Sequence, residues 1–437
     1  MIPEALDAKR IFITGSTGFV GTALVERLLR GAPGCSLTLL IRPSRKRTVD
    51  QRAAREIFSN NCFDRLRSEL GGKAELTAMV AERVRVVAGD VGTDGLGLDE
   101  TGRAALTECD TIIHSAAMVS FDAPLDRAIE VNLLGPTRIV RTCADLGITP
   151  HLVAVSTCYV AGNRRGNAPE EPVDASPFWL DDVDWQAEVD AARRIRTDAE
   201  MASRSTELLE RFRAEAREEL GAAGTPLLAA KTEAHRQDWV KAQLVEAGRV
   251  RAASLGWPDA YAYTKALAEQ ALAQNAGDVP VSIVRPSIIE SAWAEPRPGW
   301  IRGFRMAEPI IISYARGLLH EFPGIPEGTV DVIPVDLVVA AICAVAAKGP
   351  ETEREKPAIY QVASGGVNPL GYQHLVDMVQ EWFTEHPLYD SKGQPIQVPE
   401  WSFPGRGRVQ SQLTRTDKLL DVAGKTLGAL PLRGRQV

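Results

Sequence analysis

Long uninterrupted hydrophobic runs are missing from this chain of 437 residues. Asp336 breaks the apolar run 332–347, and Arg316 breaks the run 309–319. A membrane-spanning helix needs about 20 consecutive apolar residues. The first ten residues also lack the apolar core of a secretory signal. We therefore expect a cytoplasmic protein without a membrane span, and we leave peripheral membrane contact and a homo-oligomer open.

Paired cysteines and an excess of basic charge are also absent. The six cysteines form no Cys-x-x-Cys pair and no His-linked pattern, so we expect reduced thiols and no metal site. The chain has 50 Lys and Arg residues against 57 Asp and Glu, a net charge of −7. This acidic balance argues against an extended nucleic-acid-binding face, and we expect no nucleic-acid partner.

Short β-branched runs alternate with amphipathic stretches through most of the chain. Apolar runs bounded by turns are typical of parallel strands that are buried on both faces. After Gly21, one helical stripe carries four apolar residues, namely Leu24, Val25, Leu28 and Leu29. The alternation predicts an α/β fold with a doubly wound parallel sheet. The expected strands are Arg10–Thr14, Leu37–Ile41, Val84–Ala88, Thr111–Ile113, Leu152–Ser156, Val281–Val284 and Ile359–Val362.

A glycine-rich turn links the first expected strand to the first helix. Its glycines, Gly15, Gly18 and Gly21, allow a tight turn and a close approach of the backbone to a pyrophosphate. The following helix N-terminus offers free N–H groups to the same anion. A merely structural turn is the alternative, but the position between a strand and a helix is the one that dinucleotide binding requires.

Arg42 follows the second strand, 21 residues after Gly21. A carboxylate here would hold the ribose of NAD, whereas an arginine suits the 2′-phosphate of NADP. Arg45 adds to the positive field, and a solvated basic loop is the alternative interpretation. The sequence therefore predicts NADPH as cofactor. The other expected cofactor contacts lie in the turn and at strand ends: Ser16, Thr17, Phe19, Val20, Asp90, Val91, Ser115, Ala116, Ala117, Pro286 and Ser287.

Tyr261 is the only one of seven tyrosines with a lysine four residues later. On a helix this spacing places Tyr261 and Lys265 on one face. A phenol with a pKa near 10 donates a proton readily only if a neighbouring cation stabilises its phenolate. We predict that Lys265 supplies this charge, that both residues also contact the cofactor, and that Tyr261 is the proton donor of a hydride transfer.

A third polar group is expected at the end of the fifth strand, where it would anchor a substrate carbonyl oxygen. Ser156 and Thr157 both lie there, and we favour Thr157 from its position before Gly162. Asn132 either completes a proton relay through water or satisfies backbone groups in its helix. We expect His114 to be a packed strand-end residue and not a catalytic base.

Five stretches of the sequence form a recognisable set: TGSTGFVG at Thr14–Gly21, VSTCYVAG at Val155–Gly162, WPDAYAYTKALAE at Trp257–Glu269, RPSIIESAWAEPRPGW at Arg285–Trp300 and VASGGVNPL at Val362–Leu370. Together they resemble the extended short-chain dehydrogenases and, within them, the fatty acyl-CoA reductases. This resemblance implies a long-chain acyl-CoA or fatty aldehyde substrate, NADPH, and two successive hydride transfers that end in a fatty alcohol. It implies Thr157, Tyr261 and Lys265 as the catalytic set.

The domain organisation follows from these assignments. We expect residues 1–284 to bind NADP and residues 285–437 to bind substrate, with a strand near 358–364 returning to the sheet. The apolar segment 309–319 would hold an acyl chain or simply pack in the core. Three rival functions stay open: an aldehyde-releasing thioester reductase of the carboxylic-acid-reductase type, a nucleotide-sugar epimerase or dehydratase, and a non-enzymatic NADP sensor.

Residues 185–253 interrupt the strand–helix alternation with a segment rich in Ala, Glu and Arg. We expect two helices joined by a turn at 221–226 and inserted before the helix that carries Tyr261. The insertion is either a solvated helical hairpin without a role or a lid over a long apolar substrate.

Overall fold

The structure is a computed structural model that describes residues 2–164, 166–172, 183–221, 226–303, 307–321, 324–351 and 356–404. It consists of two compact units, the first formed by residues 1–302 and 333–363 and the second by residues 303–332 and 364–437. The boundary expected at 284/285 falls inside the first unit, because residues 285–302 still belong to that unit. The chain later returns to the first unit and adds a helix and a strand.

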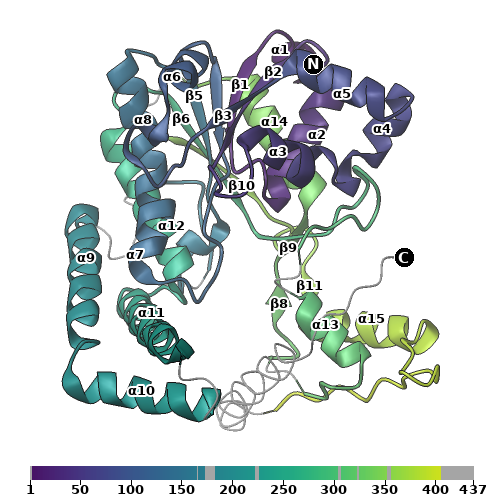
Figure 1. Cartoon of the computed structure of the whole chain (residues 1–437). Helices are drawn as coiled ribbons and strands as arrows, with labels where there is room; N and C mark the ends of the chain where they lie inside the picture. Colours follow the sequence, from purple (N-terminus) through teal and green to yellow (C-terminus); the bar gives the residue numbers. More distant parts are fainter. Residues whose placement is uncertain are drawn as a thin grey trace. The chain divides into compact units, whose positions relative to one another are not determined.

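A seven-stranded parallel sheet forms the centre of the first unit, in the order β10-β6-β5-β4-β1-β2-β3 (Figure 1). Both the predicted doubly wound fold and its seven predicted strands are confirmed. The strands are β1 (Arg10–Thr14), β2 (Ser36–Ile41), β3 (Val84–Ala88), β4 (Thr111–His114), β5 (His151–Val155), β6 (Val281–Pro286) and β10 (Ala358–Val362). Short strands β7 (Ile288–Glu290) and β9 (Val332–Pro334) lie outside this sheet.

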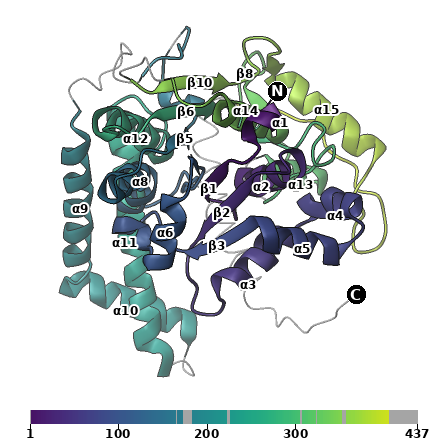
Figure 2. The same cartoon turned by 90° about the horizontal axis from the view of Figure 1, so that it is seen from above.

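Helices cover both faces of this sheet, as the view from above shows (Figure 2). Ile11 and Ile13 of β1 are fully buried in the cluster that contains α2 and α14. Phe12 is fully buried in the opposite cluster with α6 and α8. Because successive side chains of a strand point to opposite faces, the strand reads as a continuous apolar run.

The helices of the first unit connect its strands, and the predicted stripe of α2 is buried against the sheet. Two π-helical turns, η1 (Ala54–Phe58) and η4 (Ile129–Leu133), extend α3 and α7. The helices outside the insertion are α1 (Ile2–Leu6), α2 (Phe19–Gly31), α3 (Val49–Ala53), α4 (Asp64–Leu70), α5 (Lys73–Arg83), α6 (Glu100–Thr107), α7 (Leu125–Ala128), α8 (Leu134–Leu146), α12 (Ala260–Asn275) and α14 (Val335–Lys348).

The insertion has three helices in its described part, so the prediction of two was wrong. They are α9 (Trp185–Ala202), α10 (Thr206–Leu220) and α11 (Leu228–Ser254). The hydroxyl of Ser205 accepts a hydrogen bond from the amide of Leu208 and caps the N-terminus of α10. The prediction missed this helix start because the surrounding segment is uniformly charged. The predicted turn at 221–226 lies partly outside the described residues.

The insertion is not a freely solvated hairpin, since α9 and α11 pack against α7 and α12 (Figure 1). Trp185 and Val189 of α9 and Ala252 of α11 are buried in one cluster with residues of α12. Within the insertion, the rings of Phe212 and Trp239 lie 6.3 Å apart between α10 and α11. The apolar stripes of these helices therefore add a second small core to the first unit.

The second unit contains α13 (Glu308–Ala315), an antiparallel pair of β8 (Thr329–Val330) and β11 (Leu370–Gly371), and α15 (Tyr372–Glu385). The helix expected near 374–383 is confirmed as α15. In α13, the hydroxyl of Tyr314 donates to the carbonyl of Pro399 at 2.7 Å, and its ring contacts Trp401. This part of the segment 309–319 therefore contributes to packing within its own unit.

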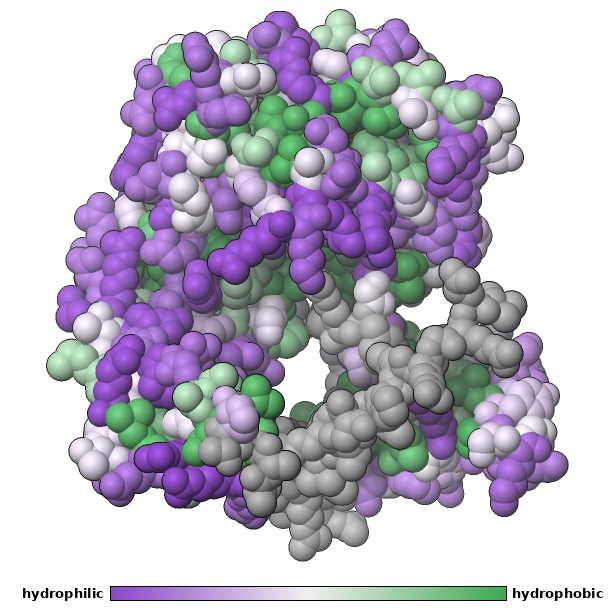
Figure 3. Space-filling view, in the orientation of Figure 1, coloured by the Kyte–Doolittle hydropathy of each residue, from purple (hydrophilic) through white to green (hydrophobic). Residues whose placement is uncertain are grey.

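Hydrophilic side chains cover much of the surface of the first unit in the space-filling view, with apolar patches between them (Figure 3). Among the helices of the described ranges, none combines the length and the apolar character that a bilayer crossing demands.

Candidate active site

The carboxyl ends of the parallel strands meet at one edge of the sheet, where ligands of this fold class bind. Strand order reverses between β1 and β4, which run side by side with Thr14 paired to His114. The glycine turn follows β1, Ser115 follows β4, and Thr157 follows β5. The topology thus brings three of the predicted segments together.

Two glycines of the turn are required by its shape. Gly15 has a φ of 78°, and a Cβ there would lie 2.5 Å from the amide nitrogen of Ala116. A Cβ on Gly21 would lie 2.2 Å from the carbonyl oxygen of Gly15. Gly18 donates its amide to the same oxygen at 2.9 Å, and α2 begins at Phe19. The backbone therefore forms a cradle at a helix N-terminus, which fits a pyrophosphate.

Two buried hydroxyl groups that follow the carboxyl ends of β1 and β6 have unused hydrogen-bonding capacity. Ser16 and Ser287 are 1% and 6% exposed, and the Oγ of each has no partner within the described ranges. Buried polar atoms without partners are rare in native proteins and call for an explanation. A bound nicotinamide dinucleotide, rich in hydroxyl and phosphate oxygens, would provide such partners, so the residues present fit this cofactor.

The other predicted contacts lie around the turn with their own local bonds. Ser115 donates its hydroxyl to the carbonyl of Thr14 at 2.9 Å, which holds the end of β4 against β1. Asp90 accepts from the amide of Gly92 at 2.9 Å, and Val91 is buried in the core. Thr17 and Val20 lie within the turn and the first turn of α2, and Ala117 follows β4.

Arg42 follows β2 directly and is exposed together with Arg45, Lys46 and Arg47. The guanidinium of Arg52 donates to the backbone carbonyl of Arg42 at 2.5 Å. This bond fixes the backbone at the start of the loop and leaves the basic side chains to face solvent.

Thr157 and Tyr261 are brought together by β5 and α12. Thr157 is 4% exposed and starts a short 3-10 turn, where its hydroxyl accepts from the amide of Tyr159 at 3.2 Å. Its side chain also lies 3.5 Å from the carbonyl of Pro286. Burial raises the pKa of Tyr261, and the charge of Asp259 raises it further, whereas a hydrogen bond with Thr157 lowers it. The phenol therefore keeps its proton at neutral pH.

Lys265 lies one turn after Tyr261 and is 4% exposed. Burial lowers the pKa of its ammonium to about 8, although the nearby Glu269 opposes this shift. Its Nζ donates to the carbonyl of Val155 at 2.8 Å. The expected lowering of the phenol pKa by Lys265 is not seen, because the ammonium is directed at this carbonyl and burial dominates at Tyr261.

Ser156 points into a different network. Its hydroxyl donates to Glu269 at 2.5 Å, and the guanidinium of Arg285 donates to the same carboxylate, also at 2.5 Å. Glu269 and Arg285 are each 4% exposed, so the ion pair is buried. Sequence reasoning missed both residues, although Glu269 continues the four-residue spacing of Tyr261 and Lys265 on α12 and could have been found from it.

Asn132 has its amide fully engaged. Its Oδ1 accepts from the amide of Met118 at 2.8 Å. Its Nδ2 donates to the carbonyl of Met118 at 3.1 Å and to the hydroxyl of Thr264 at 3.2 Å. The side chain thus serves backbone groups, although these belong to the segment after β4 and not to its own helix.

His114 is buried at the end of β4, as expected of a packed strand-end residue. Its Nδ1 lies 2.8 Å from the hydroxyl of Thr14. Burial lowers its pKa to about 3, and the charge of Lys265 contributes to this shift. The imidazole is therefore neutral over the physiological range.

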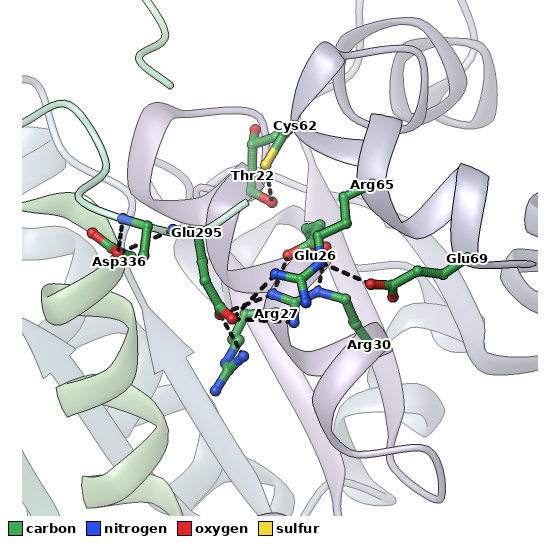
Figure 4. Close-up of polar contacts among 10 residues, drawn as sticks. Thr22, Glu26, Arg27, Arg30, Cys62, Arg65, Glu69, Glu295 and Asp336 are labelled. Carbon is green, nitrogen blue, oxygen red and sulfur yellow. Dashed lines mark hydrogen bonds and ion pairs between the residues drawn. The ribbon is translucent and has the colours of Figure 1, made fainter. Parts of the chain in front are cut away.

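The Glu-Pro-Arg-Pro-Gly-Trp segment, residues 295–300, is anchored to α2 through Glu295 (Figure 4). Glu295 accepts from Arg27 at 2.5 Å, from Arg30 at 3.0 Å and from Arg65 at 3.3 Å. The carboxylate of Asp336 on α14 accepts from three successive backbone amides, those of residues 293–295. These bonds hold the segment to α2, α4 and α14.

Trp300 completes this anchor. Its side chain is fully buried, its ring lies 5.4 Å from that of Phe19, and its Nε1 donates to Asn61 at 2.9 Å. Because Phe19 is the first residue of α2, the motif braces the helix whose N-terminus closes the glycine turn.

Known proteins share both the sequence pattern and the fold. The family described as "Male sterility protein", a family of NAD-binding domains, matches residues 13–342. An Arabidopsis thaliana protein named "Fatty acyl-CoA reductase 2, chloroplastic" is 33% identical over 90% of this chain and 60% of its own length. The "Alcohol-forming fatty acyl-CoA reductase" of Simmondsia chinensis is 31% identical over 91% of this chain and 75% of its own.

A solved structure supports the fold independently. The terminal R domain from the myxalamid PKS-NRPS biosynthetic pathway matches with a TM-score of 0.58 and 17% identity, covering 98% of this chain and 81% of that domain. The present chain spans only 60% of the length of the chloroplastic relative. The family match and the relatives at 30% identity or more nevertheless agree, and the chain belongs to the fatty acyl-CoA reductase family, whose nicotinamide-cofactor-binding domain it contains.

Proposed function

We propose that this protein reduces fatty acyl-CoA thioesters with NADPH, first to the aldehyde and then to the fatty alcohol. The observation that carries the proposal is the hydrogen-bonded pair of the buried Thr157 and the half-buried Tyr261, with Lys265 one turn later, at the sheet edge that holds the glycine turn. The names of its relatives support the acyl-CoA substrate and the alcohol product.

NADPH is proposed over NADH because of the loop after β2. Arg42 occupies the position where a carboxylate would otherwise bind the ribose 2′-hydroxyl, and it is exposed beside Arg45. A guanidinium pairs with a phosphate through two parallel hydrogen bonds. A ribose 2′-hydroxyl lacks the two charged acceptor oxygens that this pairing needs.

The substrate carbonyl oxygen would lie between the hydroxyl groups of Thr157 and Tyr261. Thr157 is buried and Tyr261 is half-buried, so their hydrogen bonds act in a medium of lower dielectric constant than water and strengthen as negative charge develops on that oxygen. A bound reduced nicotinamide supplies the hydride that attacks the carbonyl carbon.

Tyr261 supplies the proton. Its raised pKa keeps the phenol protonated at neutral pH until the carbonyl oxygen becomes strongly basic. The resulting phenolate is stabilised by the hydrogen bond with Thr157, whereas Lys265, one turn later on the same helix, donates to the carbonyl of Val155. The thioester gains one hydride and one proton to give a hemithioacetal, which expels the CoA thiol and leaves an aldehyde. A second hydride and proton convert the aldehyde to the alcohol.

The test is NADPH oxidation with a series of acyl-CoAs of increasing chain length, with products identified by gas chromatography. We expect turnover with long chains and recovery of the fatty alcohol. Recovery of the aldehyde alone would limit the proposal to the first reduction. No oxidation with any acyl-CoA or free aldehyde would overturn it, and NADH in parallel tests the cofactor assignment.

A further inference from the structure

The insertion packs against α12 on the face opposite to Tyr261. Residues two apart on a helix point about 200° apart around its axis, so Tyr263 faces away from Tyr261. Tyr263 is fully buried between α12 and the insertion. A hydroxyl in such a position needs a partner, and the insertion provides it.

That partner is Glu188 of α9. The hydroxyl of Tyr263 donates to its Oε2, which also accepts from the Nε of Arg251 on α11 at 2.9 Å. A second nitrogen of Arg251 donates to Oε1. Burial raises the pKa of Glu188, but the hydrogen bonds from Arg251 and Tyr263 lower it more, so the carboxylate is ionised. One charged group therefore joins three helices.

Tyr263 is also linked, through Trp257, to the turn that follows Thr157. Its ring lies 5.8 Å from that of Trp257, which is 1% exposed. The indole Nε1 of Trp257 donates to the carbonyl of Val160 at 3.1 Å. Val160 belongs to the 3-10 turn that begins immediately after Thr157. A shift of Tyr263 would therefore change the position of Tyr261 relative to Thr157.

We propose that Glu188, in the helical insertion, is a positioning residue that fixes the alignment of Tyr261 with Thr157 by holding Tyr263. The inference rests on the proposed function, whose proton transfer requires hydrogen-bond geometry at the phenol. Misplacement of reacting groups by about 1 Å can cost about a hundredfold in rate. The insertion acts in this view as a brace behind the catalytic helix.

The insertion offers a matched control. On α9, Arg196 pairs with Asp126 of α7 at 2.9 Å, a contact that fastens the insertion without touching Tyr263. If the insertion served stability alone, loss of the Glu188 contact and loss of the Arg196 contact would each lower Tm and leave kcat unchanged. A positioning contact would affect turnover only at Glu188 and Tyr263.

The experiment compares Tyr263→Phe, Glu188→Gln, their double variant and Arg196→Gln in the full chain. Tyr263→Phe removes one hydroxyl and keeps the ring on Trp257. We expect kcat to fall about ten- to a hundredfold, with KM for NADPH unchanged and a larger deuterium isotope effect on hydride transfer. The double variant should be no slower than the slower single variant, because both remove one coupled contact. Arg196→Gln should lower Tm and leave kcat unchanged.

The outcomes separate the two proposals. Wild-type protein that reduces no acyl-CoA or aldehyde counts against the proposed function. Wild-type turnover combined with an unchanged kcat in Tyr263→Phe, or with losses that multiply in the double variant, overturns the role of Glu188 alone. If Glu188→Gln does not fold, Tyr263→Phe still decides the question.

Discussion

The glycine turn and helix α12 contribute to the same sheet edge in opposite ways. The turn offers backbone groups, and its glycines matter because a Cβ at Gly15 or Gly21 would collide with neighbouring backbone. Helix α12 contributes side chains, and the role of each side chain depends on its hydrogen-bond partner on β5, β6 or α9. A backbone site can be recognised from a short motif, whereas a side-chain site depends on distant partners.

The largest effect is expected where one side chain performs the chemistry. Tyr261→Phe removes the proposed proton donor and should lower kcat about 10²- to 10⁴-fold, the usual contribution of general acid catalysis. Steady-state NADPH oxidation with a long-chain acyl-CoA measures this change. NADPH binding, followed by fluorescence, should be retained, and a kcat within a few-fold of wild type would refute the assignment.

The basic loop after β2 supplies side chains to the proposed cofactor site. Arg42→Glu replaces a phosphate partner with a repelling charge and should raise KM for NADPH about 10- to 100-fold, as expected for the loss of a charge-assisted hydrogen bond. KM for NADH should change far less. Equal changes for both cofactors would show that Arg42 does not read the 2′-phosphate.

In the glycine turn, the effect of a Gly→Ala substitution on stability should depend on the position that is changed. In Gly21→Ala the new Cβ would lie 2.2 Å from the carbonyl of Gly15, whereas in Gly18→Ala it would lie 3.1 Å away. We expect Gly21→Ala to lose about 1–3 kcal/mol of unfolding free energy and to bind NADPH more weakly. Gly18→Ala is the control with the smaller loss in denaturant unfolding, and equal losses would contradict this view of the turn.

The mildest test is pH. The pKa of Lys265 is lowered to about 8, so the buried ammonium that holds the carbonyl of Val155, two residues before Thr157, is present below that pH and is lost above it. Activity should therefore be about half-maximal near pH 8 and fall about tenfold per pH unit beyond. Measurements of kcat/KM from about pH 6 to 10 test this, with unfolding monitored in parallel. A flat profile to the alkaline end would exclude the role of Lys265.

The sequence alone predicted the sheet and much of the site's composition. Strand β1 was found residue for residue, because burial on both faces leaves a continuous apolar run between turns. The glycine turn and the Tyr261–Lys265 pair could be proposed from the sequence for a different reason, because each depends on spacing between near neighbours along the chain.

Other predictions failed or stayed open where partners are distant in sequence. The break between α9 and α10 depends on a single serine cap within a uniformly charged segment. The choice between Ser156 and Thr157 depends on Glu269 and Arg285, which lie more than a hundred residues away and engage Ser156. The assignment of Thr157 is a proposal that these contacts support.

Local sequence determined the strands, the glycine turn and one face of α12, since backbone geometry and helical spacing are set by neighbours along the chain. Only the tertiary structure decided what that helix touches: Val155 for the lysine, Arg285 for Glu269, and the insertion's Glu188 for Tyr263. Buried polar groups must find partners wherever the fold supplies them, and no local pattern specifies which distant residue that will be.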